Sequence, residues 1–272
     1  MYDHNIKAGN QGDVIKHTAL IAAASALMKQ CCNTFHYSDT FAGYAYNPLM
    51  PNGEWRNGIE KFYNTDKKPQ NSTIIFWREL WEYSGNLRGS VYPGSSLFML
   101  KLCLQNGLKF NARLWDISPS VISQLVTFYG YNDVELFPRP AKQEDFIRQK
   151  PNLLLIDPPG LWTKTKHEYP KLEELLGFID KVDNCILWFP MTAQGTGSPA
   201  PETKPSRDAY DLCLRQEGID VISVRWSNGI RNCGCHIAHK LQIDANKALM
   251  EVVTEVATTM NWVITANRNV KQ

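Results

Sequence analysis

The sequence has no run of about 18 consecutive apolar residues, the length that a membrane-spanning helix requires. Its first residues, MYDHNIKAGNQGD, lack the positive charges followed by an apolar stretch that mark a secretory signal peptide. No internal repeat and no low-complexity tract is present. These absences argue against a membrane span and predict a cytoplasmic protein.

Neither sign of charge dominates, because 29 Lys and Arg against 27 Asp and Glu leave a formal net charge of +2. Overall charge therefore does not indicate a nucleic-acid-binding protein, although a local basic patch stays open. Hydrophobic residues make up 43% of the 272 residues and aromatic residues 11%, which is too much for a disordered chain. We expect one domain over residues 1–272, with a monomer favoured.

A disulfide framework is also missing, since the seven cysteines are odd in number and scattered along the chain. We interpret them as reduced thiols. In NCGCHIAH (232–239) a strand would point Cys233 and Cys235 to one face and His236 to the other. This favours buried thiols over a zinc site, so we predict no metal. A Cys/His nucleophile is equally weak, because nothing marks an orienting acid.

Apolar periodicity and turn residues predict alternating strands and helices. Strands are expected at residues 35–40, 110–118, 134–140, 152–159 and 184–190, followed by a hairpin of 220–227 with 233–243. Helices are expected at 13–30 with Asp13 as N-cap, after a turn capped by Ser95 or Ser96, from Pro119, and at 171–182, 208–218 and 248–263. The aromatic-rich stretch 48–90 indicates a helical insertion. The alternation predicts an α/β fold with a mainly parallel sheet and one antiparallel strand near its edge.

Three of the predicted strands end in acids, Asp39, Asp116 and Asp157. The carboxyl ends of parallel strands meet at one edge of a sheet, so these carboxylates are expected to converge there. In DTFAGYA (39–45) the turn at Gly43 lets the backbone approach a nucleoside closely, unless it is an ordinary strand-to-helix turn. It is not G-x-G-x-x-G, so a dinucleotide site is not supported. Asp116 suits two ribose hydroxyls or, alternatively, caps the helix that follows.

The stretch LLLIDPPG (153–160) places Asp157 at the exposed end of a buried strand. A carboxylate there accepts a hydrogen bond from an exocyclic amine, and the prolines stiffen the turn and offer a carbonyl. D/N-P-P followed by an aromatic residue is typical of amino-group methyltransferases acting on adenine or similar planar substrates, and Gly160 stands at the aromatic position here. The alternative is a proline-stiffened loop without chemistry.

In KAGNQGDVIKH (7–17), Lys7, Lys16 and His17 precede or open a helix. Cations and free backbone N–H groups at a helix start favour an anion such as a carboxylate or phosphate. The alternative is a helix start with solvated lysines.

The run YDHNIKAGNQGDVIKH (2–17) resembles the N-terminal signature of the RlmJ (YhiR-type) family, adenine-N6 methyltransferases of large-subunit ribosomal RNA. Further matches follow in the family's order: SDTFAG, GEWRNGI (53–59), YPGSS (92–96), DIS, EDF (144–146), LIDPPG and LWFP (187–190). The resemblance extends through almost the whole chain. The N-terminal run is the specific part, whereas D-P-P alone is not.

The resemblance implies a Rossmann-like S-adenosylmethionine-dependent methyltransferase fold with a small helical insertion. The implied cofactor-binding residues are Asn10 and Lys16 near the methionine end, Ser95 beside them, Asp39 and Gly43 in the cofactor turn, Asp116 at the ribose, and Asp145 or Glu144 at the adenine edge. The implied catalytic residues are Asp157, the Pro158 carbonyl and Tyr2, with Lys7 and Trp162 as substrate-binding residues.

The sequence also departs from the family pattern. Lys7 replaces a histidine, and Tyr44 stands where small residues are usual, so its ring could crowd the methionine moiety. Gly160 replaces the aromatic residue that normally stacks on the base, a contact worth roughly 1–3 kcal/mol. Trp162, two residues later, is the candidate replacement.

We therefore expect an S-adenosylmethionine-dependent methyltransferase acting on an amino group, with adenine N6 in ribosomal RNA or another nucleic acid favoured. The alternative is a catalytically degenerate protein of this fold that serves as a nucleic-acid-binding or assembly subunit, and Tyr44 and Gly160 motivate it. A weaker option is a nuclease or a DNA-uptake role, which would need an acidic metal-binding cluster.

Overall fold

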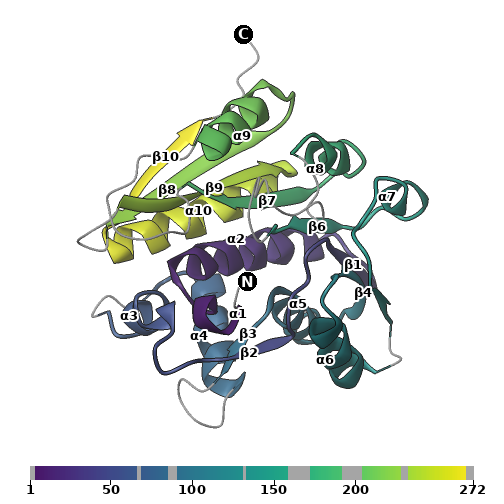
Figure 1. Ribbon diagram of the computed structural model, residues 1–272, viewed down its shortest axis with the longest axis horizontal. Coiled ribbons are helices and arrows are strands. Elements are labelled where there is room, and N and C mark those ends of the chain that lie inside the picture. The colour runs from purple at the N-terminus through teal and green to yellow at the C-terminus, as the bar shows by residue number, and fades with distance from the viewer. Residues whose placement is uncertain are drawn as a thin grey trace.

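An eight-stranded sheet runs through the molecule, and helices cover both of its faces (Figure 1). The computed structural model describes residues 4–65, 69–84, 91–130, 133–158, 172–191, 204–227 and 232–267. The strands of this sheet are β1 (Thr34–Asp39), β4 (Lys109–Trp115), β5 (Val134–Phe137), β6 (Leu153–Ile156), β7 (Cys185–Pro190), β8 (Asp220–Ser227), β9 (Asn232–Lys240) and β10 (Val263–Asn267). The helices are α1 (His4–Lys7), α2 (Gln11–Met28), η1 (Glu54–Arg56), α3 (Ile59–Tyr63), α4 (Ser72–Ser84), α5 (Ser95–Gln105), α6 (Pro119–Tyr129), α7 (Asp145–Arg148), α8 (Leu172–Ile179), α9 (Lys204–Arg215) and α10 (Ile243–Met260).

The strand order across the sheet is β10-β8-β9-β7-β6-β1-β4-β5. Neighbouring strands from β5 to β7 pair in parallel, whereas β9 runs antiparallel between β7 and β8, and β10 runs antiparallel on the outer side of β8. The order reverses at β1, because the chain first builds β4 and β5 on one side and then returns to place β6 on the other. In open α/β sheets such a reversal leaves a crevice at the carboxyl ends of the strands.

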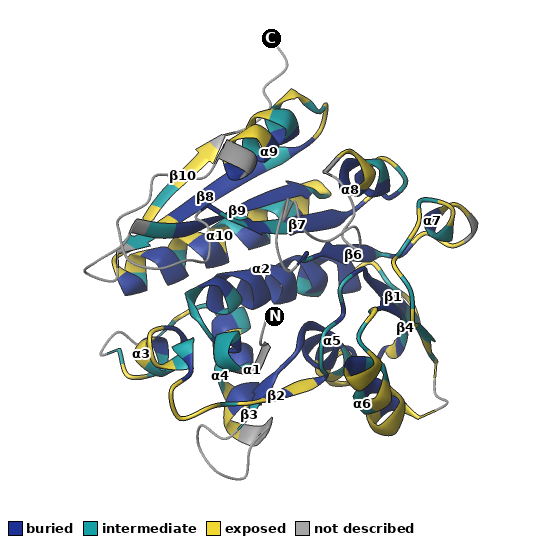
Figure 2. Cartoon of the chain, viewed as in Figure 1, coloured by how far each residue is buried: buried dark blue, intermediate teal, exposed yellow. Residues whose placement is uncertain are grey.

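Two apolar cores lie on opposite faces of the sheet. One joins the sheet to α2, α4, α5, α6 and α10, and the other joins it to α7, α8 and α9. β6, with the sequence LLLI, is buried along its whole length, as expected for a central strand that is covered on both faces (Figure 2).

α2 is buried along most of its length because alanine side chains let neighbouring helices approach closely. It packs chiefly against α10 and also contacts α4 and α5. Its N-cap is Asn10, whose side-chain oxygen accepts the Asp13 backbone N–H at 3.0 Å. The predicted N-cap, Asp13, is therefore wrong. Asp13 lies in the first turn, where its carboxylate is free to bind other groups.

The stretch predicted to be a helical insertion lies between two strands that form a small antiparallel pair, β2 (Tyr46–Pro48) with β3 (Val91–Pro93). Its helices η1, α3 and α4 lie between those strands. Trp77 of α4 is fully buried and meets Phe62 of α3 edge to face, with ring centroids 5.5 Å apart. The aromatic residues of this stretch therefore anchor it to the main core.

Three local predictions differ from the structure. The N-cap of α5 is Gly94 and neither Ser95 nor Ser96, because a Cβ at Gly94 would lie 2.0 Å from the Tyr44 carbonyl oxygen. The last predicted helix ends at Met260, where Asn261 adopts the left-handed conformation with φ 55°, and the chain turns back as β10. Two strands, β9 and β10, run antiparallel to the rest of the sheet, whereas one such strand was predicted. β9 lies inside the sheet and not near its edge.

The strand β9 alternates its side chains as expected. Cys235 packs in the core beneath α2 and α10, whereas His236 packs at a tilt against the rings of Tyr210 of α9 and Phe189 on the opposite face. Within the described ranges, no three His, Cys, Asp or Glu side chains are grouped to hold a metal ion. No helix in those ranges is both long and apolar enough to cross a membrane.

Candidate functional site at the carboxyl ends of the strands

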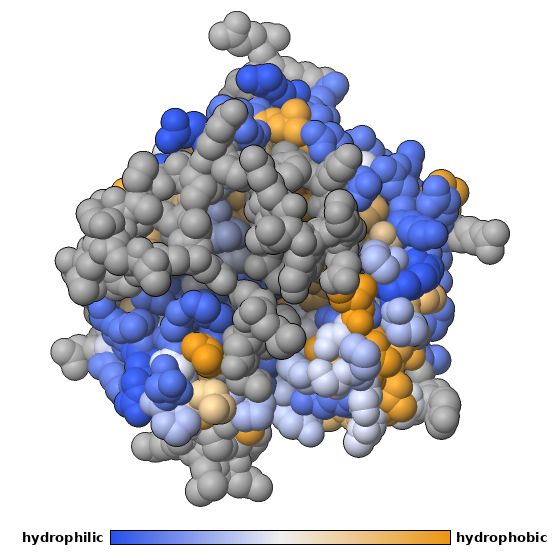
Figure 3. Space-filling model, in the orientation of Figure 1, coloured by the Kyte–Doolittle hydropathy of each residue, from blue (hydrophilic) through white to orange (hydrophobic). Residues whose placement is uncertain are grey.

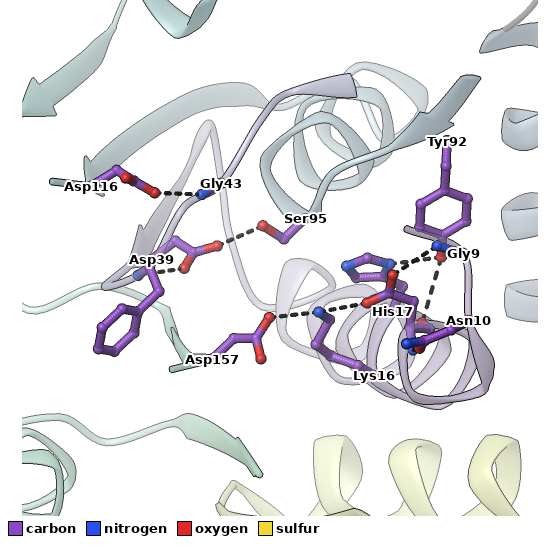
Figure 4. Close-up of polar contacts among 12 residues, drawn as sticks. Gly9, Asn10, Lys16, His17, Asp39, Gly43, Tyr92, Ser95, Asp116 and Asp157 are labelled. Carbon is purple, nitrogen blue, oxygen red and sulfur yellow. Dashed lines mark hydrogen bonds and ion pairs between the residues drawn. The ribbon is translucent and has the colours of Figure 1, made fainter. Parts of the chain in front are cut away.

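Three carboxylates lie together where β6, β1 and β4 end (Figure 4). Asp39 is the last residue of β1, and Asp116 and Asp157 directly follow β4 and β6. These strands are parallel neighbours in the sheet, so their carboxyl ends share one edge. The structure thus brings the three strand-end acids to the edge of the sheet where the strand order reverses.

Lys16 joins this edge of the sheet to the start of α2. Its ammonium lies 2.5 Å from a carboxylate oxygen of Asp157 and 2.8 Å from one of Asp13. Burial opposes its charge, but the two carboxylates outweigh that effect and raise the pKa of Lys16 well above its ordinary value. The side chain is only 8% exposed and lies 5.6 Å from the ring centroid of Trp188 on β7. Lys16 is therefore permanently charged between two acids.

The turn before α2 holds Asp13 in place. Gly9 has φ 73°, a left-handed conformation that suits glycine, and its N–H donates to Asp13 at 2.8 Å. Burial would raise the pKa of Asp13, but the Lys16 ammonium and the hydrogen bond from the Gly9 N–H lower it overall. Asn10, besides capping α2, donates to Glu54 at 3.3 Å, and the Lys7 ammonium forms an ion pair with the same carboxylate.

His17 is a neutral buried residue, in contrast to its predicted role as a cation. It is 4% exposed, and burial together with the neighbouring Lys16 charge lowers its pKa to about 3. Its Nδ1 lies 2.8 Å from the Tyr92 hydroxyl on β3. The predicted anion-binding cluster therefore lacks the positive charge that was expected of His17. The charge of Lys16 is already paired with two carboxylates of the protein.

Asp39 is fully buried and accepts three hydrogen bonds. Its donors are the Ser95 hydroxyl at 2.6 Å, the Tyr37 hydroxyl at 2.8 Å and the Phe41 backbone N–H at 3.1 Å. Burial raises the pKa of Asp39 to about 6, against the effect of these donors. Asp39 therefore changes its charge near neutral pH.

Asp116 is organised by backbone donors. The Gly43 N–H donates to it at 3.1 Å and the Ser118 N–H at 2.8 Å. Gly43 has φ 61°, and a Cβ added there would meet no atom within 4 Å, so open space lies in front of this turn. The hydroxyl of Tyr44 lies 2.8 Å from that of Ser120 in the first turn of α6. The Tyr44 ring thus extends to the Asp116 side of the site.

Asp145 belongs to a separate group of contacts. Arg139 donates to both of its carboxylate oxygens, at 2.6 and 2.9 Å, and the Lys142 N–H adds a third bond at 2.8 Å. Burial would raise the pKa of Asp145, but the bonds from Arg139 and Lys142 lower it overall. Arg139 also lies over the Phe137 ring at 5.3 Å. Both oxygens of Asp145 are thus engaged within its own loop, whereas Glu144 is exposed.

Some predicted site residues fall outside the described ranges, namely Tyr2, Gly160 and Trp162. Pro158 is described and buried directly after Asp157. Sequence reasoning missed Glu54 and Tyr92, which hold the start of α2 from the insertion and from β3. Both lie in segments that the resemblance had matched, GEWRNGI and YPGSS, but the motifs do not say which side chains they contact.

Comparisons with known proteins agree with the fold described above. No family model matches the sequence, and no curated protein matches it. Among solved structures, protein LPL1258 from Legionella pneumophila, of the family model DUF519, has a TM-score of 0.68 at 17% identity and covers 96% of this chain and 97% of its own. An rRNA methylase from Streptococcus thermophilus has a TM-score of 0.39 at 10% identity, and the match covers 81% of this chain and 95% of the methylase. A Listeria monocytogenes protein assigned to the class I S-adenosylmethionine-dependent methyltransferases has a TM-score of 0.45 at 9% identity, and the match covers 96% of this chain and 74% of the Listeria protein.

The mainly parallel sheet with helices on both faces confirms the predicted α/β, Rossmann-like fold class, and LPL1258 shares this fold. At 17% identity this likeness shows the fold alone.

Proposed function

We propose that this protein is an S-adenosylmethionine-dependent methyltransferase of the RlmJ type, acting on an amino group. Adenine N6 in ribosomal RNA or another nucleic acid is the favoured target. The observation that carries the proposal is the position of Asp157, which follows β6 beside the strand-order reversal and binds Lys16 at 2.5 Å. The neighbouring ammonium favours the charged form of a carboxylate, the form that accepts hydrogen bonds.

The charge of the site supports a cationic cofactor. Asp13 and Asp157 share one ammonium, that of Lys16, and two more acids, Asp39 and Asp116, end the neighbouring strands, so carboxylates outnumber ammonium groups among these residues. S-adenosylmethionine carries a positively charged sulfonium and an ammonium against one carboxylate, and it supplies an activated methyl group when bound. Opposite charges at short range favour such a ligand over its product, which has lost the sulfonium charge and is a zwitterion without net charge.

The proposed cofactor contacts follow the same edge of the sheet. Asp116 would bind the ribose hydroxyls, with open space at Gly43 for the nucleoside. Asp39 and Ser95 would support the methionine end together with Asn10 and Lys16. At the adenine edge the exposed Glu144 joins Asp145 as a candidate, because Arg139 already occupies both oxygens of Asp145.

In the proposed reaction Asp157 and the Pro158 carbonyl accept hydrogen bonds from the target amino group. These bonds orient the nitrogen lone pair for in-line attack and raise its nucleophilicity. To accept them, the Asp157 oxygen next to Lys16 keeps its ion pair while the second oxygen faces the amine. Tyr2, Lys7 and Trp162 are proposed to hold the substrate around this point.

One observation favours a second candidate, a degenerate protein that binds nucleic acid without catalysis. Lys16 and Arg139 hold Asp157 and Asp145, two of the carboxylates that the enzymatic role needs, in ion pairs. These ion pairs compete with the amine and with the adenine edge for the same two carboxylates.

Calorimetry separates the two candidates, followed by methyl-transfer assays. We expect S-adenosylmethionine to bind and radiolabelled methyl to appear on adenine-containing RNA, with N6-methyladenosine identified by nucleoside mass spectrometry. Asp157→Asn should abolish transfer, while the matched control Asp183→Asn, at a carboxylate that is 68% exposed, should not. No binding of S-adenosylmethionine at millimolar concentration would exclude the enzymatic proposal, and binding without transfer would favour the degenerate one.

A further inference from the structure

A pocket of about 680 Å³ lies between α4, α5, α6 and the β2–β3 pair. We call it the side pocket, and its boundary includes Tyr46, Phe76, Leu80, Leu97, Lys101 and Phe128. Nothing in the proposed methyl-transfer chemistry uses these residues. The volume falls in the range of pockets that hold small organic ligands or nucleosides.

The walls of the side pocket are aromatic and open to solvent. Tyr46 and Phe128 meet edge to face with ring centroids 5.8 Å apart, and they are 37% and 39% exposed. The floor is formed by buried leucines, Leu80 and Leu97. Apolar atoms also gather on the surface around α6 (Figure 3), where Val126 is 45% exposed. Such exposed rings offer flat faces on which a planar group can stack.

The rim of the side pocket carries three polar side chains without partners. Among the residues that the structure describes, Glu79, Lys101 and Gln105 make no hydrogen bond or ion pair. An ammonium suits a phosphate, while a carboxylate and an amide suit the amino and carbonyl edges of a base. The rim therefore matches a nucleotide better than a purely apolar ligand.

Elements that line the side pocket also carry residues of the candidate site. Tyr46 lies three residues after Gly43, and Leu97 lies two residues after Ser95. On β3, Val91 lines the pocket while the next residue, Tyr92, contacts His17. The side pocket and the candidate site are thus built partly from the same segments of the chain.

We propose that the side pocket binds an unpaired base of the same RNA whose amino group is methylated. This inference rests on the proposed function, because it identifies part of that substrate's binding surface. Single-stranded RNA is recognised by stacking splayed bases on aromatic side chains and by contacts to their edges. A partner protein's helix would be recognised by the apolar surface alone and would leave Lys101 without a role.

The test is the affinity of a fluorescein-labelled, single-stranded, mixed-sequence RNA, measured by fluorescence anisotropy without cofactor. Loss of one stacking ring in Phe128→Ala should weaken binding roughly 5- to 100-fold. Lys101→Gln should weaken it less and reduce its salt dependence. The control Ile243→Ala removes an apolar side chain that is 86% exposed on α10 and should leave the affinity unchanged.

A second measurement keeps the test valid if Phe128→Ala folds poorly. RNA carrying 4-thiouridine should crosslink in the wild-type protein to the peptides that contain Tyr46 or Phe128. Crosslinks confined to other peptides, or equal affinity in wild type and Phe128→Ala, would overturn the side-pocket proposal and leave methyl transfer standing. Absence of any RNA binding would overturn it together with the RNA substrate, while cofactor binding would still be measured separately by calorimetry.

Discussion

Replacing Lys16 by methionine tests the charge arrangement at the centre of the site. The substitution keeps a long side chain but removes the ammonium that lies 2.8 Å from Asp13 and 2.5 Å from Asp157. Removing one partner of a buried ion pair typically costs 3–5 kcal/mol, because the other charge stays buried without compensation. The two carboxylates are 19% and 20% exposed, so water screens them partly. We expect a cost of about 3 kcal/mol, the lower end of that range.

The cost should depend on pH in a defined direction. Without Lys16, the facing carboxylates have folded-state pKa values above their unfolded values, so protonation relieves their repulsion. The destabilisation is therefore present at neutral pH and shrinks as the pH falls. Urea unfolding at neutral pH and near pH 5, with the m-value checked for constancy, measures both free energies of unfolding.

The matched control is Lys109→Met, which removes the exposed pair with Asp133 and should cost less than about 1 kcal/mol. Adding Asp13→Asn to Lys16→Met should recover part of the lost stability, because one of the two facing charges is removed. The reasoning fails if Lys16→Met costs no more than Lys109→Met, or if its cost is the same at both pH values.

Three further predictions concern the proposed chemistry and its support. Asp157→Asn should lower the turnover of methyl transfer by roughly 100- to 10,000-fold. The affinity for S-adenosylmethionine, measured by calorimetry, should change far less. Equal losses of turnover and affinity would contradict a role of Asp157 in the chemical step. Because burial raises the pKa of Asp39 to about 6, cofactor affinity should increase as the pH rises through that value, and Asp39→Asn should remove the dependence. The same shift makes the folded state bind more protons than the unfolded chain, so the contribution of Asp39 to stability falls as the pH rises from about 4 to 6. Finally, Tyr92→Phe should destabilise the fold by about 1–3 kcal/mol in urea unfolding, because buried His17 loses its partner, while Tyr44→Phe at a more exposed hydroxyl should cost clearly less.

Much of the fold could be predicted because the apolar residues recur at the spacing that is typical of strands or of helices. The all-apolar run of β6 and the alanine-rich α2 could be assigned from composition alone, since each is buried on most sides. The end of α10 could not be predicted, because the apolar residues on both sides of Asn261 continue the helical pattern although the helix stops at Met260. The choice between a longer helix and β10 depends on pairing with β8, which lies more than thirty residues away in sequence.

For the candidate site, the sequence alone determined which acids stand at strand ends, because an acidic residue directly after a run of apolar residues can be recognised in the sequence. Asp39, Asp116 and Asp157 could be named from this pattern. Only the tertiary structure decided what each acid contacts, since α2 brings Lys16 to Asp157 across 141 positions of sequence. Burial and neighbouring charges in the folded chain shift the pKa values of Lys16, His17 and Asp39. Neither burial nor distance is encoded in a local motif, which is why His17 looked cationic in the sequence and is neutral in the folded protein.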